Sequence, residues 1–120
     1  MASDSSSRSS ELGRNVARRH PRYIVDLALQ ISFRRGGEKV VSSGRASELS
    51  EGGVAAYIFT DLGVGDSLVI EATLPYSSKP IALDAVIRSR LGFRYGLEFK
   101  DLNTQQKRAL TRACSTLSVL

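Results

Sequence analysis

Hydrophobic and polar residues alternate with a period of two along most of the chain from Tyr23 onward. The clearest run places five apolar side chains at alternate positions: Val25, Leu27, Leu29, Ile31 and Phe33. Strict alternation over this length is typical of a strand with one buried face. Gly36 and Gly37 follow, and glycines adopt the positive φ angles of a tight hairpin turn without steric cost. The pattern predicts a first strand that begins at Tyr23 and turns back into a second.

Five further segments show apolar alternation and are separated by turn residues. We expect strands at about 39–49, 54–60, 68–74, 80–90 and 93–100. Gly44 is the expected place of a bulge or bend in the first of these. Phe93, Tyr95 and Phe99 share one face of the last strand and are predicted to lie in the core. Six short strands joined by turns indicate a small antiparallel barrel.

The period changes near the C-terminus. Apolar residues recur there at the spacing of one helix face: Leu110, Ala113, Cys114 and Leu117. Asn103 is a good N-cap, and Gln106 three residues later completes a capping box. The predicted fold is therefore mainly all-β, a six-stranded antiparallel β-barrel with one C-terminal α-helix that covers an open end or face.

The chain has room for one domain. Residues 1–13 are rich in serine and nearly free of large apolar side chains, so we expect a disordered tail. Residues 14–22 form a basic arm, and residues 23–120 form the barrel and helix. The N-terminus has no apolar signal region, and no segment approaches the ~20 apolar residues of a membrane-spanning helix. We expect a cytoplasmic protein without membrane insertion.

The positive charge is concentrated near the N-terminus. The net charge is +5, and residues 1–22 hold five arginines against two carboxylates. Such a balance favours an anionic partner, although most basic termini are simply solvated.

The sequence offers few combinations of residues that could carry catalysis. His20 is the one histidine and Cys114 the one cysteine, at opposite ends of the chain, which argues against a metal site. A triad of Ser50, His20 and Asp26 can be assembled on paper, as in any serine-rich chain. No glycine cluster lies between a strand and a helix, as a phosphate-cradling loop requires. We expect no catalysis and no cofactor.

Two short clusters carry recognisable binding chemistry. Arg18-Arg19-His20-Pro21-Arg22 leads into the first strand, and Glu48-Leu49-Ser50-Glu51-Gly52-Gly53 joins the second strand to the third. An arginine fork binds a phosphate or the O6/N7 edge of guanine through two hydrogen bonds. A carboxylate accepts from the N1–H and N2–H₂ groups of guanine, and glycine lets a base approach the backbone. Together the clusters predict a site for a guanine nucleotide with phosphates.

The two clusters, in this order and on this strand pattern, resemble the PilZ domain, a bacterial receptor family for cyclic di-GMP. The family pattern RxxxR is matched by Arg18 and Arg22, and [D/N]xSxxG is matched by Ser50 and Gly53, with Glu48 in place of Asp or Asn. Leu74-Pro75 and the run 95–99 extend the resemblance to roughly residues 17–117. It implies a six-stranded barrel with a C-terminal helix.

The resemblance also implies which residues bind the ligand. Arg18 and Arg22, with Arg19 between them, would grip phosphates and guanines, while Glu48, Ser50 and Gly53 would line one guanine. Glu48 keeps the charge of aspartate but adds a methylene, so its carboxylate must retract or the base must shift.

Three functions follow from these observations. In the first, the chain is a cyclic di-GMP receptor or adaptor that signals to an unidentified effector protein as the ligand orders the arginine arm. In the second, it is a PilZ-like protein-interaction adaptor that has lost nucleotide binding, which the change at Glu48 favours. In the third, it binds single-stranded nucleic acid. We rank the third last, because such sites expose aromatic residues for base stacking and these are expected in the core.

Overall fold

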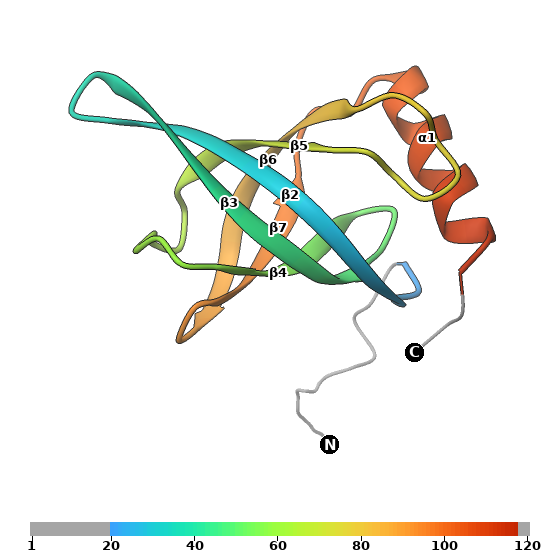
Figure 1. Cartoon of the computed structure of the whole chain (residues 1–120), viewed down its shortest axis with the longest axis horizontal. Helices are drawn as coiled ribbons and strands as arrows, with labels where there is room; N and C mark the ends of the chain where they lie inside the picture. Colours follow the sequence, from blue (N-terminus) through green and yellow to red (C-terminus); the bar gives the residue numbers. More distant parts are fainter. Residues whose placement is uncertain (1–19, 118–120) are drawn as a thin grey trace, which may run out of the picture.

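A computed structural model describes residues 20–117 as a single barrel with a helix at one end (Figure 1). Its elements follow in chain order: β2 (Tyr23–Arg35), β3 (Glu38–Leu49), β4 (Gly53–Ile58), β5 (Ser67–Ala72), β6 (Ile81–Leu91), β7 (Arg94–Phe99) and α1 (Thr104–Ser115). The predicted fold class, a six-stranded antiparallel barrel with a C-terminal helix, is confirmed for this part of the chain.

The strands close in the order β2-β3-β4-β7-β6-β5, and every neighbouring pair is antiparallel. The barrel closes between β2 and β5 through three residue pairs, from Gln30–Glu71 to Ser32–Val69. The β2–β3 hairpin continues to its turn at Gly36 and Gly37, so its tip projects beyond the barrel, as Figure 1 shows.

The barrel interior is filled by the inward half of each alternating strand. The largest fully buried side chains come from five strands and the helix: Tyr95, Ile31, Ile58, Ile70, Leu83, Ile87, Leu110 and Cys114. Tyr95 and Phe99 lie in the core as predicted, but the prediction for Phe93 is wrong, since its side chain is 44% exposed. Phe93 belongs to the turn before β7, where its ring packs on that of Phe59 with the centroids 5.6 Å apart.

The bulge of β3 lies at Ser47 and not at Gly44. Gly44 pairs regularly with β2 and β4, and its role is close packing, because an added Cβ would lie 2.8 Å from the Tyr57 carbonyl oxygen. Ala46 and Glu48 pair with consecutive residues of β4, so Ser47 is the extra residue. A bulge shifts the alternation by one position. Leu49 consequently points into the core, and Glu48 lies at the barrel surface.

Helix α1 has the predicted start. The Asn103 side chain accepts a hydrogen bond from the Gln106 backbone N–H (2.7 Å), and the Gln106 side chain accepts from the Asn103 N–H (2.8 Å). The predicted stripe is buried at Leu110, Ala113 and Cys114. Burial, with the negative charge of Glu51, raises the pKa of the Cys114 thiol to about 11, so this cysteine stays protonated. Among residues 20–117, no helix is long and apolar enough to cross a membrane.

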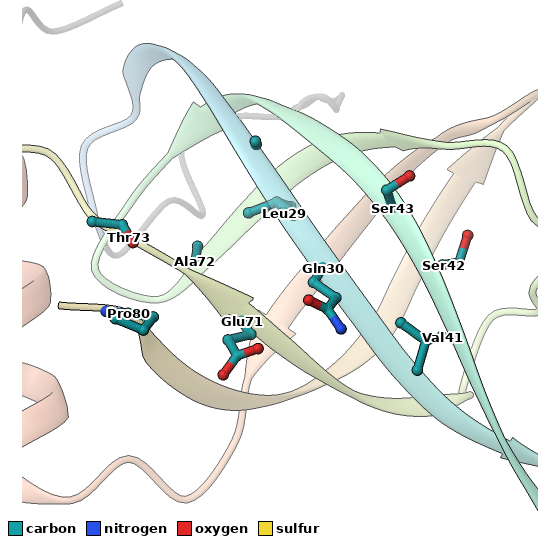
Figure 2. Close-up of a pocket in the computed structure, with 10 residues that line it drawn as sticks. Leu29, Gln30, Val41, Ser42, Ser43, Glu71, Ala72, Thr73 and Pro80 are labelled. Atoms are coloured by element: carbon teal, nitrogen blue, oxygen red, sulfur yellow. The ribbon is translucent and has the colours of Figure 1, made fainter.

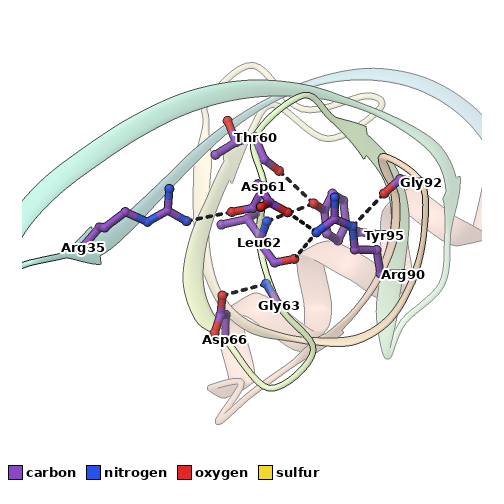
Figure 3. Close-up of polar contacts among 9 residues, drawn as sticks. All are labelled: Arg35, Thr60, Asp61, Leu62, Gly63, Asp66, Arg90, Gly92 and Tyr95. Carbon is purple, nitrogen blue, oxygen red and sulfur yellow. Dashed lines mark hydrogen bonds and ion pairs between the residues drawn. The ribbon is translucent and has the colours of Figure 1, made fainter.

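The loop between β4 and β5 is fastened to the barrel by the buried Tyr95 hydroxyl (Figure 3). This hydroxyl donates to the Thr60 carbonyl oxygen (2.7 Å) and accepts from the Leu62 N–H (3.0 Å). Two backbone groups of a loop are thereby satisfied by a core side chain.

Arg90 fixes the same end of the barrel from β6 (Figure 3). Its Nε donates to the Gly92 carbonyl oxygen and its Nη1 to the Leu62 carbonyl oxygen, both at 2.7 Å. The guanidinium also pairs with Asp61, and this hydrogen bond lowers the pKa of the Asp61 carboxyl. The loop and the β6–β7 turn are therefore held to each other.

We expect Tyr95→Phe to lower the free energy of unfolding by about 1–3 kcal/mol, because it leaves a backbone donor and acceptor without their partner. Urea denaturation monitored by circular dichroism measures this loss. Tyr57→Phe removes a hydroxyl from a side chain that is 44% exposed, and it should change stability by less than about 0.5 kcal/mol. Equal losses in both variants would contradict the role given to the Tyr95 hydroxyl.

Candidate functional site

The turn between β3 and β4 is organised by Ser50. The Ser50 N–H donates to the Gly53 carbonyl oxygen (2.9 Å), and its hydroxyl accepts from the N–H groups of Gly52 (3.2 Å) and Gly53 (3.0 Å). The serine predicted to face a ligand thus uses its hydroxyl to shape the turn. Ordered in this way, the turn presents Glu48 and the two glycines on one side of the barrel.

Both glycines of this turn lie close to neighbouring residues. A Cβ at Gly53 would overlap the carbonyl oxygen of Leu97 on β7, and one at Gly52 would lie 2.7 Å from the Cδ2 atom of His20. The Gly52 carbonyl oxygen also accepts from the Phe99 N–H (2.9 Å). The turn therefore packs directly on the backbone of β7.

The turn is also linked to helix α1. The Thr111 hydroxyl donates to Glu51 Oε1 at 2.9 Å, across 60 positions of sequence. This contact joins the turn to the helix at one end of the barrel.

Glu48 lies between two arginines. Its Oε1 is 3.5 Å from Nη1 of Arg22, and its Oε2 accepts a 2.8 Å hydrogen bond from Nη2 of Arg94 on β7. The Glu48 side chain is 23% exposed, against 45% for Arg22 and 39% for Arg94. An acidic group is thereby held beside two cations at the edge of the turn.

These residues line one open cleft of about 1220 Å³. Two more cations reach it, Arg88 from β6 and Lys107 from α1. Arg88 is paired with Glu98, whose Oε1 lies 2.6 Å from its Nε. Ala55 and Gly96 also line the cleft, and the Ser89 side chain lies against Gly96, where an added Cβ would overlap its hydroxyl. The cleft thus offers arginine forks and carboxylates together.

A second hollow, of about 830 Å³, runs over the outside of β2, β3 and β5. Figure 2 shows Gln30 and Glu71 side by side along it, together with small and polar side chains such as Ser43. Among the described residues that line it, Glu71 is the one with a charge. An anionic ligand is therefore matched by the first cleft and not by this groove. Within residues 20–117, no group of three or more His, Cys, Asp or Glu side chains could hold a metal ion.

The structure brings together Arg22, Glu48, Ser50 and Gly53, which the sequence had singled out. Arg18 and Arg19 lie outside the described residues, as do residues 1–19 as a whole. Sequence reasoning missed the arginines of β6 and β7 and Lys107. Arg94 alternates with Phe93 and Tyr95 and so falls on the polar side of the strand, but the strand order that puts β7 beside β4 is not visible in the sequence.

A family model described as the PilZ domain matches residues 17–115. No curated protein matches the chain. Among solved structures, the PilZ domain of YcgR from Escherichia coli, solved with c-di-GMP, is 21% identical with a TM-score of 0.67; the match covers 84% of this chain and 91% of that one.

Two other solved structures are similar to the chain. The inhibitor of motility MotI (DgrA) of Bacillus subtilis is 21% identical with a TM-score of 0.68, covering 91% of this chain and 55% of that one. The PilZ domain of CeSA from a cellulose-synthesizing bacterium is 19% identical with a TM-score of 0.62, covering 79% and 96%. At these identities the likeness establishes a shared fold.

We expect Gly53→Ala to destabilise the protein by about 1–3 kcal/mol or more, because the new methyl group must displace the β7 backbone. Gly63→Ala is the matched control, since its Cβ would meet nothing nearer than 3.6 Å. That variant should stay within about 0.5 kcal/mol of the parent protein. Thermal and urea unfolding of both variants measure the difference, and a Gly53→Ala protein as stable as the control would contradict the packing described here.

Proposed function

The chain belongs to the PilZ domain family, and on this basis we propose that it is a receptor for cyclic di-GMP that signals to a separate partner protein. The observation that carries the proposal is that Arg22 and the Glu48–Gly53 turn line one cleft. Its volume of about 1220 Å³ slightly exceeds the ~300–1000 Å³ of typical small-molecule sites, which suits a dinucleotide. The role is binding and not catalysis.

The proposed contacts divide between phosphate and base. Arg22, with Arg18 and Arg19, would supply charge-assisted and bidentate hydrogen bonds to the ligand phosphates. The Glu48 carboxylate would accept from the Watson–Crick edge of one guanine. Gly52 and Gly53 would let that base lie against the backbone of the turn.

Ligand binding would exchange the partners of Arg22. Nη1 of Arg22 lies 3.5 Å from Oε1 of Glu48, beyond the normal length of a hydrogen bond. A phosphate offers the guanidinium a shorter and bidentate interaction. We propose that this exchange orders the arm 14–22 against the Glu48–Gly53 turn and creates the surface that a partner protein reads.

We expect isothermal titration to show specific binding of cyclic di-GMP and far weaker binding of GMP or GTP, because one ligand with two guanines and two phosphates satisfies both clusters. Arg18→Ala and Arg22→Ala should each cost about 1.5–3 kcal/mol of binding free energy, the scale of a hydrogen bond to a charged group. Arg45→Ala is the control, since it removes the same charge from a residue that pairs with Asp26 away from the cleft.

Two results would count against this assignment. Tight binding that survives the double replacement of Arg18 and Arg22 would refute the site. A folded parent protein that shows no binding would favour the alternative, a protein-interaction adaptor that has lost the nucleotide.

We expect amide hydrogen exchange to show new protection at residues 14–22 and 48–53 when cyclic di-GMP is added, with the rest of the barrel unchanged. Ordering each residue costs about 1–2 kcal/mol, so the measured affinity should fall short of what the contacts alone suggest. An arm that is already protected without the ligand would rule out ordering as the signal.

A further inference from the structure

The Glu48 carboxylate is held by a residue that belongs to neither sequence cluster. Arg94 on β7 donates from Nη2 to Glu48 Oε2 at 2.8 Å, although the two residues are 46 positions apart. Strand β4 lies between their strands in the barrel. The Arg94 side chain must therefore cross β4 to reach the carboxylate.

Small residues make this crossing possible. Glu48 pairs with Ala55 on β4, and Ala55 pairs with Gly96 on β7, so the three form one row across the barrel surface. Arg94 lies on β7, two positions before Gly96. Ala55, in the middle of this row, places only a methyl group beside Glu48. The strand register thus places Arg94 within hydrogen-bonding distance of Glu48.

The two carboxylate oxygens of Glu48 differ in their hydrogen bonding. Oε2 is satisfied by Arg94, whereas Oε1 is shielded from solvent and accepts no hydrogen bond from any group in residues 20–117. Arg22 is the nearby cation, at 3.5 Å. A buried acceptor without a donor is costly and needs an explanation. A ligand donor could satisfy Oε1 once Arg22 turns from Glu48 to a ligand phosphate, the exchange proposed above.

We propose that Arg94 is a positioning residue that makes the chain selective for guanine, by fixing Glu48 so that Oε1 receives the N–H groups of the base. The proposal rests on the function proposed above. Glutamate has one more rotatable bond than aspartate, and the Arg94 hydrogen bond removes that added freedom. Because each carboxylate oxygen has two lone pairs, Oε2 can keep Arg94 while the carboxylate binds the ligand.

The test compares cyclic di-GMP with cyclic di-IMP, which has the same phosphates but lacks the exocyclic N2 amine that donates to a carboxylate. The parent protein should prefer cyclic di-GMP. Arg94→Met removes the hydrogen bond to Glu48 and keeps an unbranched side chain about as long as the aliphatic part of arginine. We expect this variant to lose most of that preference, about tenfold, as for one hydrogen bond to a charged group, while its affinity for cyclic di-IMP changes little.

Arg88→Met is the matched control. Arg88 lines the same cleft but pairs with Glu98, so its replacement removes the same charge without freeing Glu48. It should affect both ligands equally and leave their ratio unchanged. Arg94→Lys can still donate one hydrogen bond to Oε2 and should keep part of the preference. In a Glu48→Gln background, Arg94→Met should have no further effect on the ratio.

The outcomes separate this inference from the proposed function. If the folded parent protein binds neither ligand, the proposed function is wrong, and the inference falls with it. If the parent protein binds both ligands equally, or if Arg94→Met weakens both by the same factor, the receptor function stands and the positioning role of Arg94 is overturned. Unfolding curves of each variant confirm that the affinities refer to native protein.

Discussion

The position of the candidate site depends on one extra residue in β3. Ser47 interrupts the alternation between Ala46 and Glu48, so that Leu49 is buried at 2% exposure while Glu48 lines the cleft. Without the bulge, the period of two would place Glu48 on the core side with Ala46 and expose Leu49. A buried carboxylate and an exposed leucine are both unfavourable. Core packing therefore selects the register that also presents the acidic residue to a ligand.

The turn that follows the bulge is held in place by contacts with β7 and α1. Gly53 is held against the Leu97 carbonyl, Gly52 accepts a hydrogen bond from Phe99, and Glu51 accepts one from Thr111. Strand β7 and helix α1 thus fix the turn from two directions.

The fold was predictable because its signals are local. Alternation, paired glycines and the Asn103–Gln106 capping box are read within a few residues, and the structure confirms them. The exceptions are non-local. Phe93 follows the alternation of β7 but lies in a turn, where Phe59 from another loop covers part of its ring. Gly44 suggested a bulge, yet its need for space comes from the facing strand β4.

The candidate site also combines features that are local in sequence with features that are not. Its motif residues could be found because they are contiguous in sequence, whereas the contribution of Arg94 depends on which strands become neighbours. The described cations of the cleft are largely paired within the protein: Arg22 and Arg94 with Glu48, and Arg88 with Glu98. A phosphate that binds Arg22 or Arg88 must therefore replace a carboxylate partner. The strength of binding is then set by the geometry of the exchange more than by the number of arginines, because a bidentate phosphate contact exceeds a 3.5 Å ion pair.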